Sequence, residues 1–447
     1  MRRRPAQAVT VGFLATIAVG TLLLTLPVSA AGRSASLLEA LFTATSAACV
    51  TGLAVVDTET FWTPFGQAVI LVLIQVGGFG VMTVASLLGL LVSRRLGLNT
   101  RMVAAESTHG AGLGEVRTVM LGALQFTIVA EVLVGLCVAG RLATAYGESP
   151  GHALWSGFFH AVSAFNNAGF SLYSDSLVRF VADPWVCLPI CAAVIVGGLG
   201  FPVLLELWRL HRSGRRRVLH WHRWSIHARL TMGTTAALLV LGSLFVLAAE
   251  WGNPGTLGPL DAGGKLLAAF TQAVMPRTAG FNSVDVSQMN NGTWFVTDAL
   301  MFIGAGSAGT AGGIKVGTFA LLAFAIWAEL RGDPDVTVLD RRVASATIRQ
   351  ALTVALVGVA AVVVPTMIMT ATTTTFTLDQ MLFEVTSAFS TTGLSTGITA
   401  DLPGWHQLVL VALMFLGRLG PITLGSSLAL RERQRLYRMP EARMIIG

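Results

Sequence analysis

Long apolar segments recur along the chain, and they are the first feature that predicts its structure. Each is close to the roughly 20 residues that a helix needs to cross the hydrocarbon core of a bilayer. Short stretches rich in polar and charged residues separate them. The candidate spans are residues 8–30, 64–92, 119–140, 184–207, 230–249, 294–328, 351–370 and 404–430. The pattern therefore predicts an all-α integral membrane protein.

A shorter motif lies between the two spans of each successive pair. It consists of Phe, nine residues, Gly, and then Leu or Phe. The copies read FTATSAACVTGL from Phe42, FHAVSAFNNAGF from Phe159, FTQAVMPRTAGF from Phe270 and FEVTSAFSTTGL from Phe383. Their glycines lie roughly 110–117 residues apart, which indicates an internal repeat. The predicted repeats are residues 1–101, 102–228, 229–340 and 341–447.

Each copy of the motif begins with an apolar stretch of about twelve residues, too short to cross a bilayer and typical of a re-entrant helix. The stretch that follows is expected to be extended and to end in Gly. Non-helical backbone at membrane depth is tolerated only where protein buries it or where it lines a water-filled cavity. Four such elements, related by repetition, would surround one axis. The fold class is therefore four pseudo-symmetric helix–pore-loop–helix repeats around one central pore.

The residues at the end of each motif are candidates for binding a dehydrated cation. Small residues precede the glycines, and glycine permits backbone angles that let successive carbonyl groups face the same way. Carbonyl oxygens in such a ring can replace the hydration shell of K⁺. The predicted ion-binding residues, acting mainly through their backbones, are Cys49, Val50, Thr51, Gly52, Asn166, Asn167, Ala168, Gly169, Arg277, Thr278, Ala279, Gly280, Ser390, Thr391, Thr392 and Gly393.

The span at 294–328 contains a glycine-rich interruption. Residues 304–313 read GAGSAGTAGG, followed by Ile and Lys315. Glycine costs a helix interior about 1 kcal/mol relative to alanine, so this run should not be helical. A loop below the ring could obstruct the pore, and its predicted gate residues include Gly304, Gly306, Gly309, Gly312 and Gly313. The alternative is a small-residue packing interface between helices.

Two basic residues accompany the predicted gate. Arg418 stands in the last span, where the corresponding positions of repeats one and two are Gly78 and Gly198. A charge within a span is costly and usually faces a cavity or a partner, so Arg418 is expected to face the pore. It would repel cations, hold the loop by hydrogen bonding, or act as a structural anchor. Lys315 is either a second regulatory charge or a side chain that snorkels toward the cytosol.

Composition and charge strengthen the membrane assignment. Only 12% of residues are charged and 53% are hydrophobic, whereas soluble proteins carry about a quarter charged residues. Basic clusters at 2–4, 94–101, 209–229, 331–349 and 431–438 each follow an even number of spans. The positive-inside rule therefore places both termini in the cytoplasm. The net charge of +7 fits anionic lipid or a cytosolic partner better than nucleic acid.

The motifs CVTGL at 49–53, NNAGF at 166–170, PRTAGFN at 276–282 and STTGL at 390–394 resemble those of a known superfamily. It comprises the Trk, Ktr and plant HKT potassium transporters, and the resemblance extends to its KtrB membrane subunits. It implies a potassium-channel-like fold in which Gly52, Gly169, Gly280 and Gly393 form the selectivity filter. Because Ser replaces the first of these glycines in relatives that carry sodium, Gly52 favours potassium. The resemblance also makes 304–313 an intramembrane gate and Arg418 the pore arginine.

The same resemblance implies the protein's partners. It predicts a homodimer in the plasma (inner) membrane, resting on a cytosolic KtrA-like ring that binds ATP or ADP, with Na⁺ as a possible activator. The chain itself shows no nucleotide-binding fingerprint, metal-ligand spacing or nucleophile–base pair, so we expect no resident cofactor and no enzymatic activity.

Two alternatives remain for the transport mode. One is a sodium-preferring or unselective channel of the same fold. The other is a cation-coupled secondary transporter. Such transporters usually have discontinuous helices in pairs, and the sequence predicts only one interrupted span.

Overall fold

The computed structural model describes residues 5–95, 113–212 and 220–430, which are almost entirely helical. The first two repeats contain α1 (Pro5–Leu24), α2 (Leu37–Ala48) and α3 (Pro64–Arg95), then α5 (Leu113–Ala145), α6 (Pro150–Phe165), α7 (Pro184–Leu199) and α8 (Phe201–Arg212). The last two contain α10 (Ile226–Glu250), α11 (Ala262–Val274), α12 (Asn291–Phe302) and α13 (Val316–Arg331), then α14 (Ser345–Thr372), α15 (Leu378–Ser390) and α16 (Gly404–Leu430). Strands β1 (Thr337–Val338) and β2 (Arg341–Arg342) form a small antiparallel hairpin. Short 3₁₀ turns cover Pro27–Ser29, Val178–Phe180, Trp221–Arg223, Val286–Gln288 and Thr399–Asp401.

Some predictions fall on residues outside these ranges. They are the basic clusters at 2–4 and 431–438, Arg101, Arg215–Arg217 of the cluster at 209–229, and the boundary between the first two repeats at 101/102. The boundary at 228/229 falls in the first turn of α10, and the one at 340/341 lies between the two strands of the hairpin.

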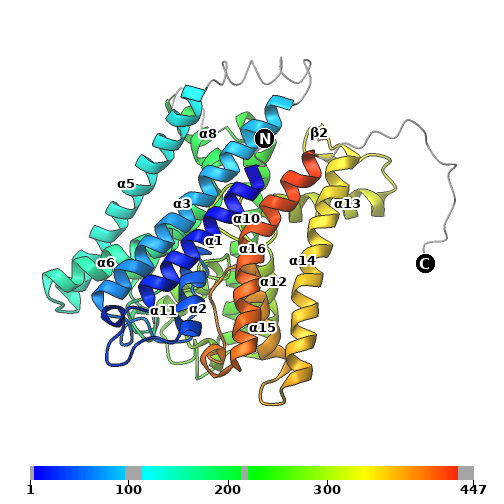
Figure 1. Ribbon diagram of the computed structural model, residues 1–447. Coiled ribbons are helices and arrows are strands. Elements are labelled where there is room, and N and C mark those ends of the chain that lie inside the picture. Colours follow the sequence, from blue (N-terminus) through cyan, green and yellow to red (C-terminus); the bar gives the residue numbers. More distant parts are fainter. Residues whose placement is uncertain (1–4, 96–112, 213–219, 431–447) are drawn as a thin grey trace.

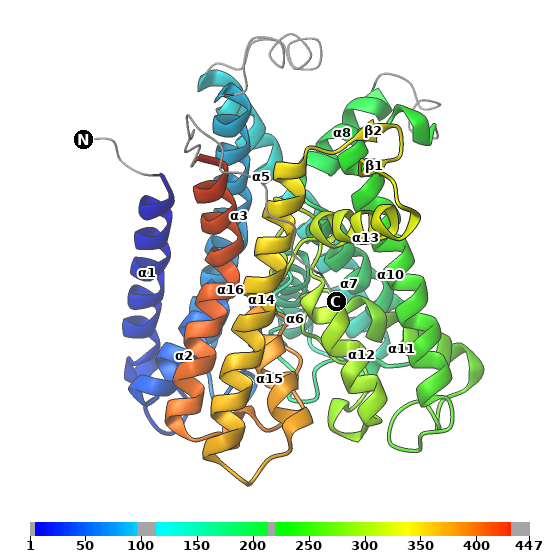
Figure 2. The same cartoon turned by 90° about the vertical axis from the view of Figure 1, so that its right-hand side faces the viewer.

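A short helix between two long ones is the unit of the fold. The short helices α2, α11 and α15 lie in the lower half of both views, while α8 and the β hairpin lie at the opposite end (Figures 1 and 2). Sequence determines where these short helices begin. Ser36 and Glu39 form a capping box at α2, and Thr377 and Gln380 form another at α15. The first residues of α1 and the last of α16 lie at the upper end, so the described chain begins and ends on the same side.

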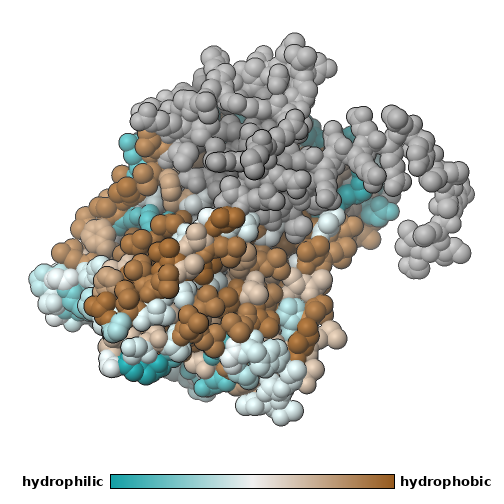
Figure 3. All heavy atoms as spheres, in the orientation of Figure 1, coloured by the Kyte–Doolittle hydropathy of each residue, from teal (hydrophilic) through white to brown (hydrophobic). Residues whose placement is uncertain are grey.

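The helices are long and apolar enough for a membrane. By length and composition, three helices in the described residues could cross a bilayer, at 121–145, 226–250 and 345–372, and the α7–α8 pair is a fourth if counted as one span. Helices α1, α3 and α16 run over 20, 32 and 27 residues and contain shorter apolar parts. A broad hydrophobic band crosses the middle of the surface (Figure 3). A patch of this extent indicates contact with lipid, and the chain is a multi-pass membrane protein.

The structure corrects one prediction about the spans. The segment 184–207 was expected to be continuous, but α7 and α8 meet at a bend of 99°. Gly200 sits at the bend with φ +91°, an angle that residues with a Cβ rarely adopt. Pro202 then occupies the first turn of α8, where its missing N–H costs nothing. Glycine followed closely by proline was the signal in the sequence, and it was overlooked.

The interruption predicted in the third repeat is present. Helix α12 ends at Phe302 and α13 begins at Val316, so residues 303–315 form a non-helical connection. The two ends of this connection lie together, because the backbone N–H of Ile314 donates to the carbonyl of Phe302 at 3.1 Å.

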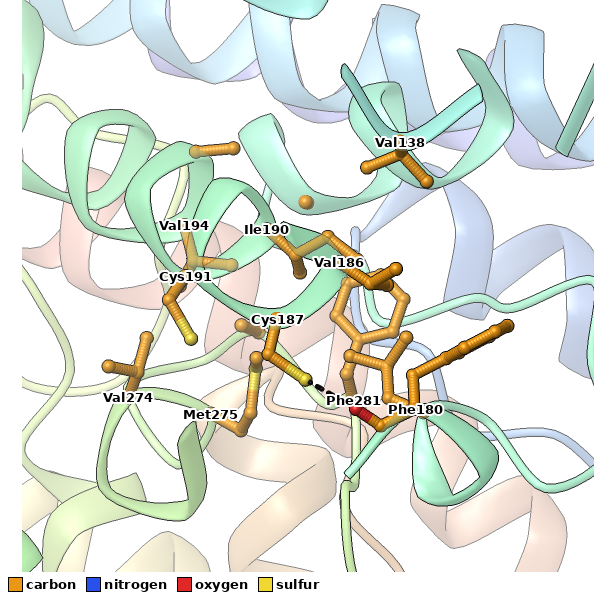
Figure 4. Packing of buried hydrophobic residues seen from close by; sticks show 14 of the residues in the cluster. Val138, Phe180, Val186, Cys187, Ile190, Cys191, Val194, Val274, Met275 and Phe281 are labelled. Atoms are coloured by element: carbon orange, nitrogen blue, oxygen red, sulfur yellow. Dashed lines mark hydrogen bonds between the residues drawn. The ribbon is translucent and has the colours of Figure 1, made fainter. Parts of the chain in front are cut away.

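Neighbouring repeats pack through small and medium apolar side chains. In Figure 4, Val186, Ile190 and Val194 of α7 lie near Val274 at the end of α11 and near Phe281, the last residue of the third motif. The Cys187 thiol donates to the carbonyl of Phe180 at 3.2 Å. This packing places the motifs of repeats two and three next to each other.

Candidate functional site

The four motif glycines form a closed ring. A Cβ placed on Gly52 would collide with the Ala168 carbonyl oxygen and lie 3.1 Å from the Cα of Gly169. A Cβ on Gly169 would lie 2.7 Å from the Ala279 carbonyl oxygen and 2.8 Å from the Cα of Gly280. The circuit continues from Gly280 to Gly393 and from Gly393 back to Gly52. A Cβ added to Gly280 would lie 3.1 Å from the Cα of Gly393, and one added to Gly393 would lie 3.1 Å from the Cα of Gly52. Each glycine thus meets the next repeat in chain order, and no side chain fits between them.

The backbone around the ring repeats its conformation four times. We use the term ring segments for residues 49–52, 166–169, 277–280 and 390–393. In every ring segment the glycine has a positive φ, between +72° and +96°. The residue two positions earlier is also left-handed, and these four residues are Val50, Asn167, Thr278 and Thr391. Non-glycine residues occupy this region rarely and at a cost, so its recurrence at equivalent positions indicates a functional constraint.

The hydrogen bonds at the ring leave several oxygens free. The Ser46 and Ser387 hydroxyls accept the backbone N–H groups of Gly52 and Gly393, each at 3.0 Å. In both repeats one and four, a serine six residues before the glycine thus fixes the backbone N–H of that glycine. In the described part of the chain, the following buried hydroxyls have no hydrogen-bond partner: Thr51, Thr278, Ser390, Thr391 and Thr392. Buried polar groups are normally paired, and a cation or water at the ring would satisfy such oxygens.

The glycine-rich loop, residues 304–313, docks on the bend between α7 and α8. The N–H of Gly306 donates to the carbonyl of Gly198 at 2.8 Å, and the N–H of Thr310 donates to that of Gly197 at 3.4 Å. The break at Gly200 frees these carbonyls from helix α7. A Cβ on Gly309 would lie 2.7 Å from the Gly198 oxygen, so glycine is needed for the close approach. The loop is therefore buried within the protein, as broken backbone at this depth requires.

Three cationic side chains donate to carbonyls of this loop. Arg277, in the third ring segment, donates from Nη2 to Gly304 at 3.1 Å. Lys315 donates from Nζ to Ala311, so its ammonium turns back onto the loop. Arg418 donates from Nη1 to Thr310 and from Nη2 to Gly77 on α3 at 3.2 Å. Arg418 is only 2% exposed. These two hydrogen bonds link the loop to the first repeat.

The loop also contacts the ring segments directly. The Thr310 hydroxyl donates to the Asn167 side-chain oxygen at 2.6 Å. A Cβ on Gly312 would meet the Thr391 hydroxyl and lie 3.1 Å from the carbonyl carbon of Ser390. Sequence reasoning did not single out Thr310, because a lone threonine in a glycine-rich run carries no pattern. Its contacts come from tertiary structure alone.

Comparison with known proteins places this geometry in a family. The model of one protein family, TrkH, described as a cation transport protein, matches residues 3–432. The chain is 41% identical to Ktr system potassium uptake protein B of Bacillus subtilis (strain 168), covering all of this chain and 98% of that protein. It is 38% identical to the protein of the same name from Vibrio alginolyticus, covering 99% and 94%. It is 34% identical to the potassium/sodium uptake protein NtpJ of Enterococcus hirae, covering 100% and 98%.

The fold is similar to a solved structure. The crystal structure of the potassium transporter TrkH from Vibrio parahaemolyticus superposes with a TM-score of 0.72, covering 95% of this chain and 84% of that one. The sequence identity is 17%, so this likeness concerns the fold alone. It confirms the predicted all-α class with repeated pore-loop units.

Proposed function

Because the chain belongs to the TrkH family of cation transport proteins, we propose that it is the membrane subunit of a potassium uptake system and conducts K⁺ passively through the ring of glycines. Membership confirms the resemblance drawn from the four motifs, and it makes the chain a transporter rather than an enzyme. The observation that carries the proposal is the closed contact circuit of Gly52, Gly169, Gly280 and Gly393. The carbonyl that precedes each glycine meets the glycine of the preceding repeat, so oxygens gather where a dehydrated cation would pass.

The glycine-rich loop is the gate in this proposal. It lies against two ring segments and is held by Arg277, Lys315 and Arg418. None of these three cations forms an ion pair with a carboxylate in the described residues. Their charges would oppose a cation in the passage below the ring, and the loop's glycines allow it to rearrange without side-chain clashes. Opening requires Arg418 to release Thr310.

Regulation comes from outside the chain. We assign the membrane face that carries α8 and the β hairpin to the cytosol, together with both termini, because Arg209, Arg341 and Arg342 lie on these elements. A cytosolic KtrA-like ring that binds ATP or ADP would dock there beneath a homodimer of this chain. The names of two relatives include the words "Ktr system", which fits a multi-component assembly.

Sodium is the second ion to consider. One relative carries "potassium/sodium uptake" in its name, which fits Na⁺ either as an activator or as a second transported ion. Glycine at position 52 favours K⁺ as the main cargo in this chain.

A coupled transporter is the second candidate function, and one observation favours it. With the bend at Gly200, the described residues contain two discontinuous spans, in repeats two and three, where the sequence predicted one. Paired discontinuous helices are typical of secondary transporters. Proton or sodium coupling would make K⁺ flux depend strictly on the gradient of the second ion.

The test is ion uptake by liposomes that contain the purified protein. Passive conduction predicts K⁺ uptake driven by the K⁺ gradient alone, larger than Na⁺ uptake, and modified by nucleotide when the cytosolic ring is added. Uptake that stops when a proton or sodium gradient is removed would establish the coupled transporter instead. Absence of K⁺ uptake in both arrangements would refute the proposed function.

A further inference from the structure

A buried carboxyl group lies beside the ring in the second repeat. Glu131 belongs to α5, within the apolar stretch at 121–145 that is long enough to cross a membrane. Its side chain is 6% exposed, and it takes part in no ion pair within the described residues. Ionisable groups at this depth are costly and are usually present for a specific purpose.

Glu131 belongs to a closed hydrogen-bonded triangle. Its Oε1 accepts a hydrogen bond from the side-chain amide of Asn166 at 3.0 Å. Its Oε2 accepts one from the amide of Gln75 at 3.5 Å. The Asn166 amide also donates to the Gln75 side-chain oxygen at 2.9 Å. Three polar side chains from α3, α5 and the end of α6 therefore hold one another inside an apolar region.

Asn166 is the first residue of the second ring segment. It caps α6 and precedes Asn167, whose φ is +59°. Its side chain is also confined by the backbone of α3. A Cβ placed on Gly78 would lie 3.0 Å from the Cβ of Asn166 and would collide with its side-chain oxygen. The Asn166 side chain thus lies between Gly78 of α3 and the carboxyl group of Glu131.

The other ring segments lack this arrangement. The residues equivalent to Asn166 are Cys49, Arg277 and Ser390. The Arg277 guanidinium donates to a loop carbonyl, and the Ser390 hydroxyl has no partner among the described residues. In the described chain, the second ring segment is therefore the one whose first residue donates to a buried carboxyl group. The buried Glu384 accepts instead from Ser395, Thr396 and Thr399, which follow the fourth ring segment.

We propose that Glu131 is a positioning residue that fixes the second ring segment through Asn166 and thereby sets how strongly the ring prefers K⁺ over Na⁺. The inference rests on the proposed function of the ring. Discrimination between two ions of equal charge depends on the number and placement of the coordinating oxygens. The Glu131 acceptor keeps Asn166 at the end of α6, so that Asn167, Ala168 and Gly169 present their carbonyls in fixed positions. Without it, this quarter of the ring relaxes around the smaller ion.

The experiment compares K⁺ and Na⁺ uptake by liposomes containing the full-length protein or its variants, at equal amounts of folded protein. Glu131→Leu removes the acceptor, and the K⁺/Na⁺ uptake ratio is expected to fall about tenfold, as expected for one lost buried hydrogen bond. Glu131→Gln keeps an acceptor for Asn166, and its ratio should stay within about twofold of the original. A variant that is merely destabilised would lower both fluxes together and leave the ratio unchanged.

A second variant disturbs Asn166 from the opposite side. Gly78→Ala adds a Cβ that collides with Asn166, although alanine suits the helix better than glycine. Its ratio should fall as in Glu131→Leu. The matched control is Gly80→Ala on the same helix, where Phe13, at 3.9 Å, is the neighbour that an added Cβ would meet among the described residues. Combining Glu131→Leu with Gly78→Ala should lower the ratio little further, because both act through one residue.

The outcomes separate this inference from the function on which it rests. If the unaltered protein shows no K⁺ uptake, the proposed function fails first. If the unaltered protein prefers K⁺ and Glu131→Leu prefers it equally, the positioning role is refuted. A Glu131→Gln variant as unselective as Glu131→Leu would also overturn it, because the charge and not the hydrogen bond would then be responsible.

Discussion

The four ring segments are alike, whereas the long helices that follow them in each repeat, here called the second helices, differ from one repeat to the next. All four ring segments share the same two left-handed positions and the same contact with the next repeat. Among the second helices, α3 and α16 are continuous, α7–α8 is bent by 99°, and α12–α13 is separated by a loop. In the proposed function, the four similar ring segments would form a symmetric site for the cation, and the divergent loop of the third repeat would be the part that moves.

The second helices pack closely against the ends of the short helices, and this contact differs in the third repeat. Gly77, Gly197 and Gly417 each pack against a carbonyl near the end of the short helix in their own repeat, at Ala48, Phe165 and Phe389. The corresponding glycine of repeat three, Gly306, meets Leu199 of repeat two instead. The third repeat has exchanged a contact within the repeat for one between repeats, and this exchange places its loop under the ring.

The largest effect is expected when the symmetry of the ring is broken. Gly52→Ser puts a side chain where Gly52 has φ +93° and where a Cβ collides with the Ala168 oxygen. We expect the K⁺/Na⁺ uptake ratio to fall by about 100-fold, from strain of about 1–3 kcal/mol and displaced oxygens. The control is Gly12→Ala, because an added Cβ there has no atom of the described residues within 4 Å. Selectivity that survives in a folded Gly52→Ser protein would count against the ring as a filter.

The next largest effect is expected when the asymmetric part is removed. Deleting residues 304–313 takes away the loop that docks on Gly197 and Gly198. Because the remaining ring is intact, K⁺ flux should rise about tenfold or more and respond weakly to nucleotide on the partner ring. Liposome uptake, with size-exclusion chromatography to confirm folding, measures this. Unaltered flux in a folded deletion variant would exclude a gating role.

A smaller effect is expected from loosening the loop without deleting it. Arg418→Ala removes the donors to Thr310 and Gly77, and should increase K⁺ flux about fivefold, since one such bond contributes about 1 kcal/mol to the closed arrangement. Arg418→Lys keeps the charge but cannot reach both carbonyls. It should therefore resemble Arg418→Ala if hydrogen bonding matters, and the unaltered protein if repulsion of cations matters. A variant that only fails to fold would support the structural-anchor interpretation.

The smallest effect is expected from removing the hydrogen bond between the glycine-rich loop and the second ring segment. Thr310→Val keeps the shape of the side chain but loses the hydroxyl that donates to Asn167. We expect a change of about threefold in the K⁺/Na⁺ uptake ratio. The lost hydrogen bond holds Asn167, which belongs to the second ring segment, to Thr310 of the loop. Thr310→Ser retains the hydroxyl and should behave like the unaltered protein. Equal ratios in all three proteins would show that the ring and the loop act independently.

Much of the fold could be predicted because it depends on local pattern. Apolar segments of the right length, the repeated motif with its glycines, and the glycine run at 304–313 each act within a few residues. The bend at Gly200 was predictable in the same way, from Gly200 and Pro202, but the apolar character of 184–207 concealed it. Polar groups such as Thr310 and Glu131 were not predictable, since their roles depend on residues far away in the sequence.

By itself, the sequence determined the membrane environment, the four repeats and the glycine positions where a left-handed backbone is allowed, because hydrophobic length and the absence of a Cβ act locally. It did not determine the left-handed conformation of Val50, Asn167, Thr278 and Thr391. Only the tertiary structure decided that the four glycines touch in a circle, that α7 bends under the loop, and that Arg418 reaches both Thr310 and Gly77. These contacts join residues from different repeats, and their geometry exists only once the helices have packed.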